Sequence, residues 1–281
     1  MLDVSCVQMN SVLADKEANI DKMSGFIDRI MSERPETQLI VFPELITTGY
    51  ECSMEQCHEL AERSDGGRSI DYFKEKCAEK NVNMIFGYVE KDKNIDSVLY
   101  NAAVFIDDTG NVLGNYRKTH PTYGEQKWCL AGRDLPIINA SFGKVGIMIC
   151  WDAAFPEVAR LYSYQGADLL VVPTCWENPY SDDWDLVTRA RAFDSTLHLV
   201  SANRVGFDVT RGFFGHSNII DPTGKVLTSL DDDIEGVVFS SIDLELSKKL
   251  RTEYYTFFRD GQPDLYSRVL TRIKDTDQGY I

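Results

Sequence analysis

Residues 145–172, VGIMICWDAAFPEVARLYSYQGADLLVV, decide the fold class of this chain. The segment opens with an apolar run at 145–149, continues with a helical pattern over 155–164, and closes with a second apolar run at 168–172. Short apolar runs are typical of buried strands, whereas apolar residues spaced three and four apart are typical of a helix with one buried face. A strand, a helix and a strand in succession predict an α/β fold.

The same alternation of strands and helices extends through the rest of the chain. Further strands are predicted at residues 2–9, 38–42, 83–89, 99–106, 112–117, 197–202, 215–220, 225–230 and 237–242, and further helices at 16–32, 69–80, 183–194 and 244–251. Because no Ser/Gly-rich linker or change of composition interrupts this pattern, we expect a single domain over residues 1–281. The tail at 252–281 is rich in aromatic residues, and we expect it to dock on the domain or on a partner subunit.

Composition argues against several classes of function. The 281 residues include 29 Lys and Arg against 44 Asp and Glu, and this formal charge of −15 disfavours nucleic acid and anionic membranes as partners. No segment approaches the roughly 20 apolar residues of a membrane span, and no leader peptide is recognisable, so we expect a cytoplasmic protein. The seven cysteines form no CxxC pair and the four histidines no HExxH motif, so we expect free thiols, no metal and no other cofactor.

Three polar residues come just after predicted strands, and they are Glu44, Lys118 and Cys150. Ligands of α/β folds gather beyond the carboxyl ends of strands, and hydrolysis of an amide needs a nucleophile, a proton acceptor and a cation. A carboxyl group among apolar residues should have a raised pKa, so Glu44 could accept the proton of Cys150. Lys118 and the backbone N–H of Trp151 could hold the oxyanion of a tetrahedral intermediate. Taken singly, the three residues could instead be a packed thiol, a solvent-facing carboxylate and an exposed turn.

The surrounding sequence decides between these alternatives. VFPELITTGY (41–50), NYRKTHPTYGEQKW (115–128) and VGIMICWDAAFPEVAR (145–160) resemble, in this order, three motifs of the nitrilase superfamily of carbon–nitrogen hydrolases. The resemblance covers essentially the whole chain. It implies the four-layer α-β-β-α sandwich of that superfamily, with two sheets between helical layers, and a small-molecule hydrolase that forms a thioester intermediate.

The resemblance also implies roles for individual residues. Cys150 would be the nucleophile, Glu44 the general base and Lys118 the cation that stabilises the oxyanion. Glu125 would be a second glutamate that positions the substrate and Lys118; the alternative is a surface carboxylate beside Lys127, because the preceding loop varies in length. Four aromatic residues are candidates for lining the substrate pocket, namely Trp151, Trp176, Tyr123 and Tyr50.

The residues after the nucleophile indicate the branch of the superfamily. Nitrilases typically have Cys-Trp-Glu there, whereas this chain has Cys150-Trp151-Asp152, which is closer to amidases and carbamoylputrescine amidases. The arginine pair that carbamoyl-amino-acid hydrolases use on a substrate carboxylate is replaced by Ala153-Ala154. We therefore expect an amidase that converts a small amide into a carboxylic acid and ammonia. Hydrolysis of an N-carbamoyl amine, hydrolysis of a nitrile, and a catalytically silent binding protein stay open as alternatives.

Three further expectations concern neighbouring residues and assembly. His120 permits a Cys/His protease interpretation, but no motif supplies the Asn or Asp that would orient its imidazole. Cys175 follows a strand without a companion acid, and we expect a structural role for it. Superfamily members usually dimerise through helices that correspond to residues 155–164 and 183–194, so we expect a homodimer or a larger homo-oligomer.

Overall fold

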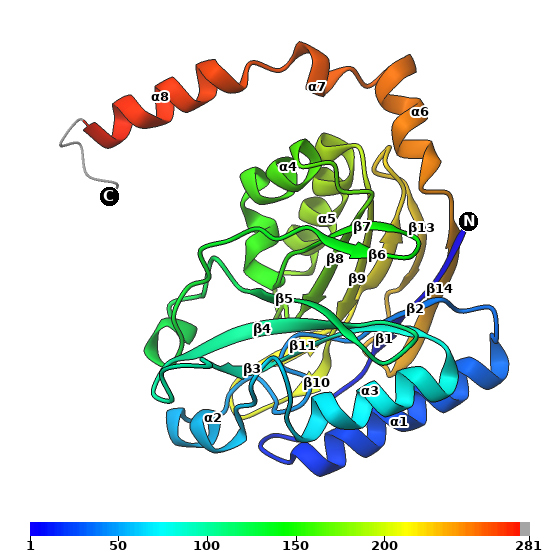
Figure 1. The fold of residues 1–281 in the computed structure, drawn as a ribbon, viewed down its shortest axis with the longest axis vertical. Helices are drawn as coiled ribbons and strands as arrows, with labels where there is room; N and C mark the ends of the chain where they lie inside the picture. The colour runs from blue at the N-terminus through cyan, green and yellow to red at the C-terminus, as the bar shows by residue number, and fades with distance from the viewer. Residues whose placement is uncertain (276–281) are drawn as a thin grey trace.

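The computed structural model describes residues 1–275 and contains two six-stranded sheets that face each other between layers of helices (Figure 1). The first sheet has the strand order β14-β1-β2-β3-β4-β5, and the second has the order β13-β12-β9-β8-β7-β6. The α/β class and the four-layer α-β-β-α sandwich expected from the sequence are therefore confirmed.

The first sheet comes mainly from the N-terminal half of the chain. Its strands are β1 (Leu2–Gln8), β2 (Leu39–Val41), β3 (Asn83–Lys91), β4 (Leu99–Ile106), β5 (Val112–Arg117) and β14 (Gly236–Ile242). β1, β2 and β3 are parallel, and β4 and β5 continue the sheet as an antiparallel meander. The far edge is β14, which lies antiparallel to β1 along its whole length.

The second sheet comes from the C-terminal half. Its strands are β6 (Ile138–Ala140), β7 (Gly143–Ile147), β8 (Leu169–Thr174), β9 (His198–Asn203), β12 (Ser217–Ile220) and β13 (Val226–Leu230). β7, β8 and β9 are parallel, and the outer strands are antiparallel to their neighbours. Because parallel strands end at the same edge of a sheet, the residues that follow β7 and β8 lie close together.

Four helices cover the outer faces of the two sheets (Figure 1). They are α1 (Lys16–Glu33) and α3 (Arg68–Lys80) on the first sheet, and α4 (Pro156–Tyr164) and α5 (Ser181–Ser195) on the second. α1 begins where the Asp15 side chain accepts a hydrogen bond from the N–H of Ala18, and Ile20, Met23 and Ile27 form its buried face.

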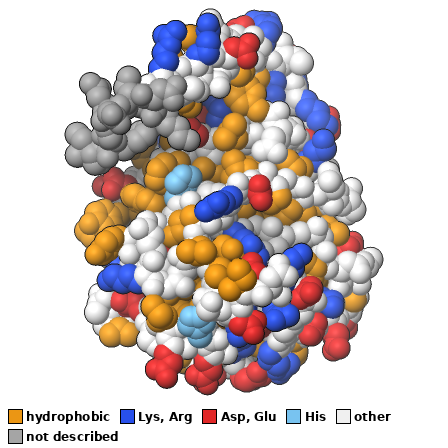
Figure 2. Space-filling model, turned by 60° about the vertical axis from the view of Figure 1, so that its left-hand side comes forward, with side chains coloured by type: hydrophobic (Ala, Val, Ile, Leu, Met, Phe, Trp, Pro, Cys, Tyr) orange, Lys and Arg blue, Asp and Glu red, His pale blue; other side chains and the backbone are white. Residues whose placement is uncertain are grey.

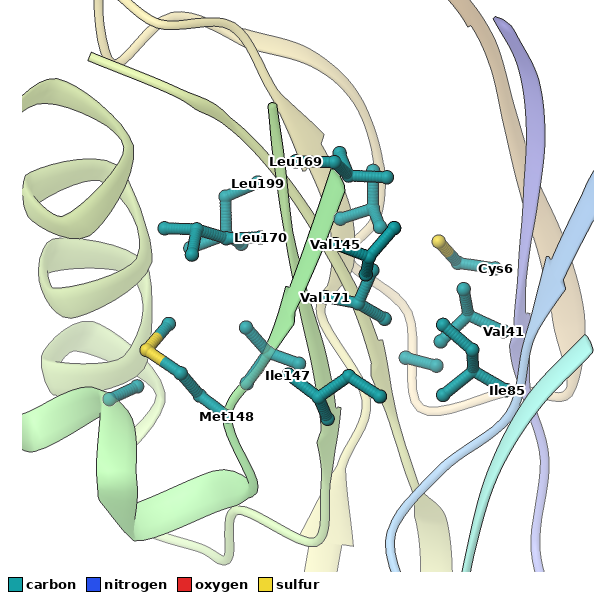
Figure 3. Close-up of a cluster of buried hydrophobic side chains, with 14 of the residues drawn as sticks. Cys6, Val41, Ile85, Val145, Ile147, Met148, Leu169, Leu170, Val171 and Leu199 are labelled. Carbon is teal, nitrogen blue, oxygen red and sulfur yellow. The ribbon is translucent and has the colours of Figure 1, made fainter. Parts of the chain in front are cut away.

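Apolar side chains fill the space between the sheets. Cys6, Val41 and Ile85 of the first sheet point toward Val171 of the second, and all four are fully buried (Figure 3). Leu170 points the other way, toward the helical layer, because successive side chains of a strand alternate between its faces. Each sheet is thus covered on both faces, which explains why these strands appear in the sequence as continuous apolar runs.

Several short elements were not predicted from the sequence, among them α2 (Met54–Leu60), β6, β10 (Val205–Phe207) and β11 (Gly212–Phe214). Three residues are too few to show a periodic pattern, and α2 is a single short helix inside a loop. The strand predicted at 215–220 begins only at Ser217, because Gly215 and His216 have positive φ values of 81° and 57° that interrupt extended structure.

The tail has two parts with different surroundings. It contains the end of α6 (Glu245–Glu253), then α7 (Phe257–Asp260) and α8 (Pro263–Asp275). Tyr255 and Phe257 pack edge to face on Phe193 of α5, and Phe258 packs in the same way on Tyr164 of α4. α8 runs away from the sandwich and exposes Leu265, Tyr266, Val269 and Leu270 (Figure 1). Docking of the tail on a partner subunit stays a prediction, and residues 276–281 lie outside the described residues.

The surface carries charged side chains of both signs. On the face drawn in Figure 2, hydrophobic side chains gather across the middle and acidic side chains along the lower rim. Among residues 1–275, no helix combines the length and the apolar character needed to cross a membrane.

Candidate active site

Cys150 lies where the chain leaves β7 and enters a short 3-10 helix, Cys150–Ala154. Its φ of 47° is left-handed, a conformation that residues with a Cβ rarely adopt and that is enriched at active sites. The residue is 5% exposed, and it lines a cavity. The turn therefore presents the thiol to the cavity at the end of the strand.

Asp152 holds this turn in place. Its fully buried carboxylate accepts a hydrogen bond from the N–H of Ile149 at 3.0 Å. It also accepts hydrogen bonds from the Tyr116 hydroxyl at 2.7 Å, the Thr119 hydroxyl at 2.9 Å and the His120 N–H at 2.9 Å. Because those three groups lie at the end of β5 and just after it, one carboxylate ties the nucleophile turn to a strand of the other sheet.

His120 is held away from the role of a general base for Cys150. Its Nδ1 lies 2.9 Å from the Asp152 carboxylate, and its ring stacks on Phe155 with 3.8 Å between ring centroids. Among the described residues, no hydrogen bond joins His120 to Cys150, so the geometry does not support a Cys/His protease. Within residues 1–275 no group of three or more His, Cys, Asp or Glu side chains is arranged to hold a metal ion.

Glu44 reaches the site through a loop that crosses β3 at close range. A Cβ added at Gly87 of β3 would lie 2.5 Å from the Leu45 nitrogen and 2.6 Å from the Glu44 Cα. The N–H of Gly87 donates to the Pro43 carbonyl at 3.0 Å, and the Gly87 carbonyl accepts from the Ile46 N–H at 3.1 Å. Glycine at position 87 therefore lets the loop lie against the strand and fixes the position of the Glu44 backbone.

Glu44, Lys118 and Glu125 form one buried cluster with Asn101. The Lys118 ammonium donates to Glu44 Oε1 at 2.7 Å and to the two Glu125 oxygens at 2.8 and 2.9 Å. The Asn101 amide nitrogen donates to Oε1 of Glu44 and to Oε1 of Glu125, both at 2.7 Å. None of the four residues is more than 2% exposed. Glu125 therefore lies inside the cluster, and the surface location considered as its alternative is wrong.

The two carboxylates share one ammonium, and their pKa values shift in opposite directions. Burial raises the pKa of Glu44 to about 7, although Lys118 favours the ionised form. Burial also opposes ionisation of Glu125, but the charge and hydrogen bonds of Lys118 outweigh it and leave the Glu125 pKa lowered. Burial opposes the charge of Lys118 too, yet the two glutamates outweigh this effect and raise the Lys118 pKa. Burial, followed by the charge of Glu44, raises the pKa of the Cys150 thiol. Near neutral pH, Glu44 is the member of this cluster that can gain or lose a proton.

The backbone after β8 completes the surroundings of Glu44. The N–H of Cys175 donates to Glu44 Oε2 at 2.9 Å, and the Cys175 thiol donates to the Glu44 carbonyl oxygen at 3.1 Å. Lys118 and Asn101 both donate to Oε1, so Oε2 has the single donor Cys175 among the described residues. This contact has no signature in the sequence, because every residue type except proline can supply a backbone N–H.

A cavity of about 600 Å³ opens beside Cys150. All four aromatic candidates, Tyr50, Tyr123, Trp151 and Trp176, contribute to its lining. The Trp151 and Trp176 rings lie 5.5 Å apart, and Tyr123 is 81% exposed at the mouth. The other lining residues are Thr122, Gly124, Lys127, Cys150, Cys175, Glu177, Tyr180, Asp183 and Arg211. A concave cavity of this size, lined by both aromatic and polar residues, suits a small-molecule ligand.

One wall of the cavity joins two segments that are far apart in the sequence. The Asp208 carboxylate accepts hydrogen bonds from the N–H groups of Tyr50 and Glu51 at 2.9 and 3.0 Å, and the Glu51 carboxylate accepts one from the N–H of Arg211 at 3.1 Å. These bonds fasten the loop that carries Tyr50 to the β10–β11 ribbon. Arg211 is ion-paired with Glu177, and both line the cavity. Neither was predicted as a site residue.

Comparison of the sequence with known proteins identifies the family of this chain. Residues 3–252 match the carbon-nitrogen hydrolase family. The chain is 50% identical over 269 residues to a Schizosaccharomyces pombe protein named "Probable nitrilase C965.09", a match that covers 96% of this chain and 98% of that protein. It is 33% identical over 266 residues to the 2-oxoglutaramate amidase of Bacillus subtilis, covering 94% of this chain and 98% of that enzyme.

A solved structure extends the comparison to the fold. The carbon-nitrogen hydrolase from Helicobacter pylori has a TM-score of 0.88 and 26% sequence identity to this chain, with 96% of this chain and 98% of that one covered. The matched sequence and the matched sandwich agree with the three motifs around Glu44, Lys118 and Cys150. This chain therefore belongs to the carbon-nitrogen hydrolases of the nitrilase superfamily.

Proposed function

We propose that this hydrolase is an amidase that converts a small amide into a carboxylic acid and ammonia, with Cys150 as the nucleophile. The observation that supports it is a thiol that lines a cavity, together with a buried carboxylate of raised pKa that is hydrogen-bonded to an ammonium and to the cavity lining. Cys150 lines the cavity, while Glu44 is hydrogen-bonded both to Lys118 and to the backbone of Cys175, another lining residue. Acyl transfer to a thiol requires these three kinds of group.

In this mechanism, deprotonation of Cys150 accompanies its attack on the substrate. Because burial raises the pKa of the Cys150 thiol, little thiolate exists at neutral pH. Glu44, with a pKa near 7, accepts the thiol proton on Oε2, the oxygen with the single donor. The sulfur forms a bond to the amide carbon, and the π electrons of the carbonyl move to its oxygen.

Lys118 and the Trp151 backbone N–H stabilise the oxyanion that results. Glu125 keeps the ammonium of Lys118 oriented through hydrogen bonds to both of its oxygens. When the tetrahedral intermediate collapses, the carbon–nitrogen bond breaks and Glu44 transfers its proton to the departing nitrogen. Ammonia leaves, and the acyl group remains on Cys150 as a thioester.

Water completes the reaction in the second half. Glu44 takes one proton from a water molecule while the water oxygen attacks the thioester carbon. Collapse of this second intermediate breaks the carbon–sulfur bond, and Glu44 returns the proton to the sulfur of Cys150. One water is consumed and one carboxylic acid is released. No atom changes its oxidation state, so the reaction balances without an oxidant or a reductant.

The aromatic residues Tyr50, Tyr123, Trp151 and Trp176 would contact the acyl group of the substrate. Similarity to 2-oxoglutaramate amidase makes amides at the end of a short chain the first substrates to test. Over 192 residues, 61% of this chain, the sequence is also 34% identical to the N-carbamoylputrescine amidase of Arabidopsis thaliana, so N-carbamoyl amines belong in the same test.

A screen for released ammonia tests the proposal. Short amides, ω-amides, N-carbamoyl amines and nitriles are offered to the wild type, to Cys150→Ala, and to Cys77→Ala as a control at another buried thiol. We expect turnover to be fastest with an amide, to be retained in Cys77→Ala, and to fall by about 10³-fold or more in Cys150→Ala. Faster release from a nitrile or an N-carbamoyl amine would replace the amidase assignment. Full activity in Cys150→Ala would refute the nucleophile.

Alkylation separates an enzyme from a silent binding protein. An active enzyme should show one thiol, Cys150, that reacts with iodoacetamide much faster than the other six cysteines, because it lines the cavity and can pass its proton to Glu44 as it reacts. A mass spectrum of enzyme quenched during turnover should show the acyl group on Cys150. Equal labelling of all thiols, with no turnover of any compound, would favour a binding protein.

We also propose that the chain forms a single domain and that the protein is cytoplasmic. We expect it to assemble into a homodimer or a larger homo-oligomer. α4 and α5 expose Leu161, Tyr164, Leu186 and Phe193, and α8 exposes a further apolar set, so this side of the second sheet offers a surface for a second copy. Light scattering at micromolar concentration should give the mass of a dimer or a larger oligomer, and a monomer would contradict this part of the proposal.

A further inference from the structure

Asn101 is a polar residue in a strand that is otherwise apolar on both faces. It lies in β4, and its carbonyl accepts the backbone N–H of Lys118 at 2.8 Å, so the two residues are neighbours across the β4–β5 pair. Its side chain has no exposed surface. An amide in this position must make its hydrogen bonds to other buried groups.

The Asn101 amide closes a ring of hydrogen bonds. Going around this ring, Glu44 Oε1 accepts from the Lys118 ammonium at 2.7 Å, and Lys118 donates to Glu125 Oε1 at 2.8 Å. Glu125 Oε1 accepts from the Asn101 nitrogen at 2.7 Å, and that nitrogen donates back to Glu44 Oε1 at 2.7 Å. Two donors thus alternate with two carboxylate oxygens, and Oε1 of each carboxylate accepts from both a cation and a neutral amide.

The ring leaves one end of Asn101 without a partner. Its Oδ1 atom is buried and has no hydrogen-bond partner among the described residues. A leucine of nearly the same size would carry no such unsatisfied oxygen, so the amide gains nothing for packing at that end. What only the amide provides is its two N–H groups, and both are directed at carboxylates of the site.

We propose that Asn101 is a positioning residue that separates Glu44 from Glu125 and leaves Glu44 Oε2 as the oxygen that exchanges protons with Cys150 and water. This inference rests on the proposed function and adds a fifth residue to its machinery. Asn101 acts through Glu44 and Glu125 and does not touch the reacting atoms. Without it, Lys118 alone would have to keep two like-charged carboxylates apart.

A neutral donor is suited to this place. The titratable groups that face Glu44 are Lys118, Glu125, Cys150, Cys175, Cys129 and Tyr50. Burial raises the pKa values of the three thiols and of Tyr50, so at neutral pH only Lys118 and Glu125 are charged there. A second cation at position 101 would hold Glu44 ionised and stop it from acting as an acid, whereas the amide favours the ionised form only modestly.

Two substitutions test the role of the amide. Asn101→Leu removes both donors at nearly constant volume, and Asn101→Asp replaces the amide with a third carboxylate of the same shape. The matched control is Asn83→Leu, because Asn83 is another buried asparagine of the same sheet, donates to the Gln38 carbonyl, and also has a side-chain oxygen without a partner among residues 1–275. Loss of a donor raises the pKa of Glu44, so the sign of the expected change is fixed.

The measurements are kcat/KM against pH and, independently of any substrate, the rate of Cys150 alkylation by iodoacetamide against pH. In Asn101→Leu we expect kcat to fall by about tenfold or more and the acidic limb of both profiles to move up by about one pH unit. Asn101→Asp should move the limb in the same direction and further, and Asn83→Leu should leave the limb where it is in the wild type. If Asn101→Leu does not fold, the isosteric variant Asn101→Asp alone is sufficient to test the proposal.

An acidic limb that stays in place in both Asn101 variants would overturn the positioning role, whatever their activity. That result differs from a failure of the proposed function, which would appear in the wild type as no turnover of any amide and no preferential alkylation of Cys150. The alkylation profile distinguishes a failure of the positioning role from a failure of the proposed function. It reports proton transfer from Cys150 even when the true substrate is not among the compounds offered.

Discussion

Replacing Gly87 by alanine tests whether the position of the Glu44 backbone limits catalysis. Gly87 lies in the middle of β3 and does not line the cavity, and the loop that carries Glu44 lies against it. The substitution adds one methyl group and changes no polar atom. Any loss of activity must therefore come from displacement of that loop.

The size of the displacement follows from the contacts. The new Cβ would lie 2.5 Å from the Leu45 nitrogen and 2.6 Å from the Glu44 Cα, whereas ordinary contact begins at roughly 3.5 Å, so about 1 Å must be made up. β3 is hydrogen-bonded on both sides, to β2 and to β4, and the loop is the part that can move. A shift of about 1 Å lengthens the 2.7 Å bonds that Glu44 accepts from Lys118 and Asn101 beyond hydrogen-bond range.

Two quantities should change together in Gly87→Ala. Displacement of this size costs roughly 100-fold in kcat, and the overpacked contact costs about 1–3 kcal/mol in the free energy of unfolding. For a domain of this size, the latter corresponds to a decrease in Tm of about 2–10 °C. Ammonia release measures the first quantity and differential scanning calorimetry the second.

Gly25→Ala is the matched control. Gly25 lies inside α1, and a Cβ there would meet nothing within 4 Å, so alanine should raise the stability by about 0.5–1 kcal/mol and leave kcat unchanged. Wild-type kcat and wild-type Tm in Gly87→Ala would refute the argument that this strand fixes the position of Glu44.

Three further outcomes follow from the buried polar groups. First, kcat/KM should increase as pH rises through about 7, because Glu44 must be ionised to accept a proton and its pKa is about 7. A flat pH profile across that region would contradict the role of Glu44 as the base. Second, Asp152→Asn should slow both turnover and alkylation of Cys150 by about tenfold to 100-fold, because an amide cannot accept all the hydrogen bonds that hold the nucleophile turn. Alkylation of this variant at the wild-type rate would contradict the role of Asp152 in holding the turn. Third, burial lowers the pKa of His198 from 6.5 to about 4, so the folded state binds fewer protons than the unfolded state between these values. The free energy of unfolding, measured with urea, should therefore fall by up to about 3 kcal/mol as pH decreases through this window, and His198→Leu should reduce that slope; an unchanged slope would assign the effect to other groups.

Most of the fold could be predicted because its strands are covered on both sides. A strand buried on both faces is apolar at successive positions, as in residues 145–149 and 168–172, and such runs are visible without knowledge of the pairing. The positions of Glu44 and Cys150 were visible for a related reason, since each is a polar residue where an apolar run stops, whereas Lys118 was visible as the residue after the strand predicted at 112–117. Their roles came from the resemblance and not from the runs themselves.

Asn101 illustrates a signal that was present and not used. It interrupts the apolar strand predicted at 99–106, and a polar residue inside a strand with two buried faces needs a buried partner. The sequence alone does not reveal which partner, because Asn101 meets Glu44 57 positions away along the chain.

The remaining parts of the site depend on contacts that no local pattern records. The N–H of Cys175 that reaches Glu44 belongs to the backbone, and the same contact could be made by other residue types. Asp208 meets the N–H of Tyr50 158 positions away, so the wall formed by the β10–β11 ribbon exists only once two distant loops are side by side. Loops of this kind carry specificity, and for that reason the substrate was the least predictable property of the chain.

The pairing of β1 with β14 has a consequence for biosynthesis. Leu2 lies opposite Ile242 and Gln8 opposite Gly236, so β1 leaves the ribosome more than 200 residues before the strand that pairs with its outer edge. At translation rates of about 5–20 residues per second, that edge stays open for roughly 10–50 s. During this interval β1 offers unpaired backbone groups to any extended chain nearby, including neighbouring copies on the same message. In the folded chain β14 pairs with this edge, so the edge is protected only once residues 236–242 have been synthesised.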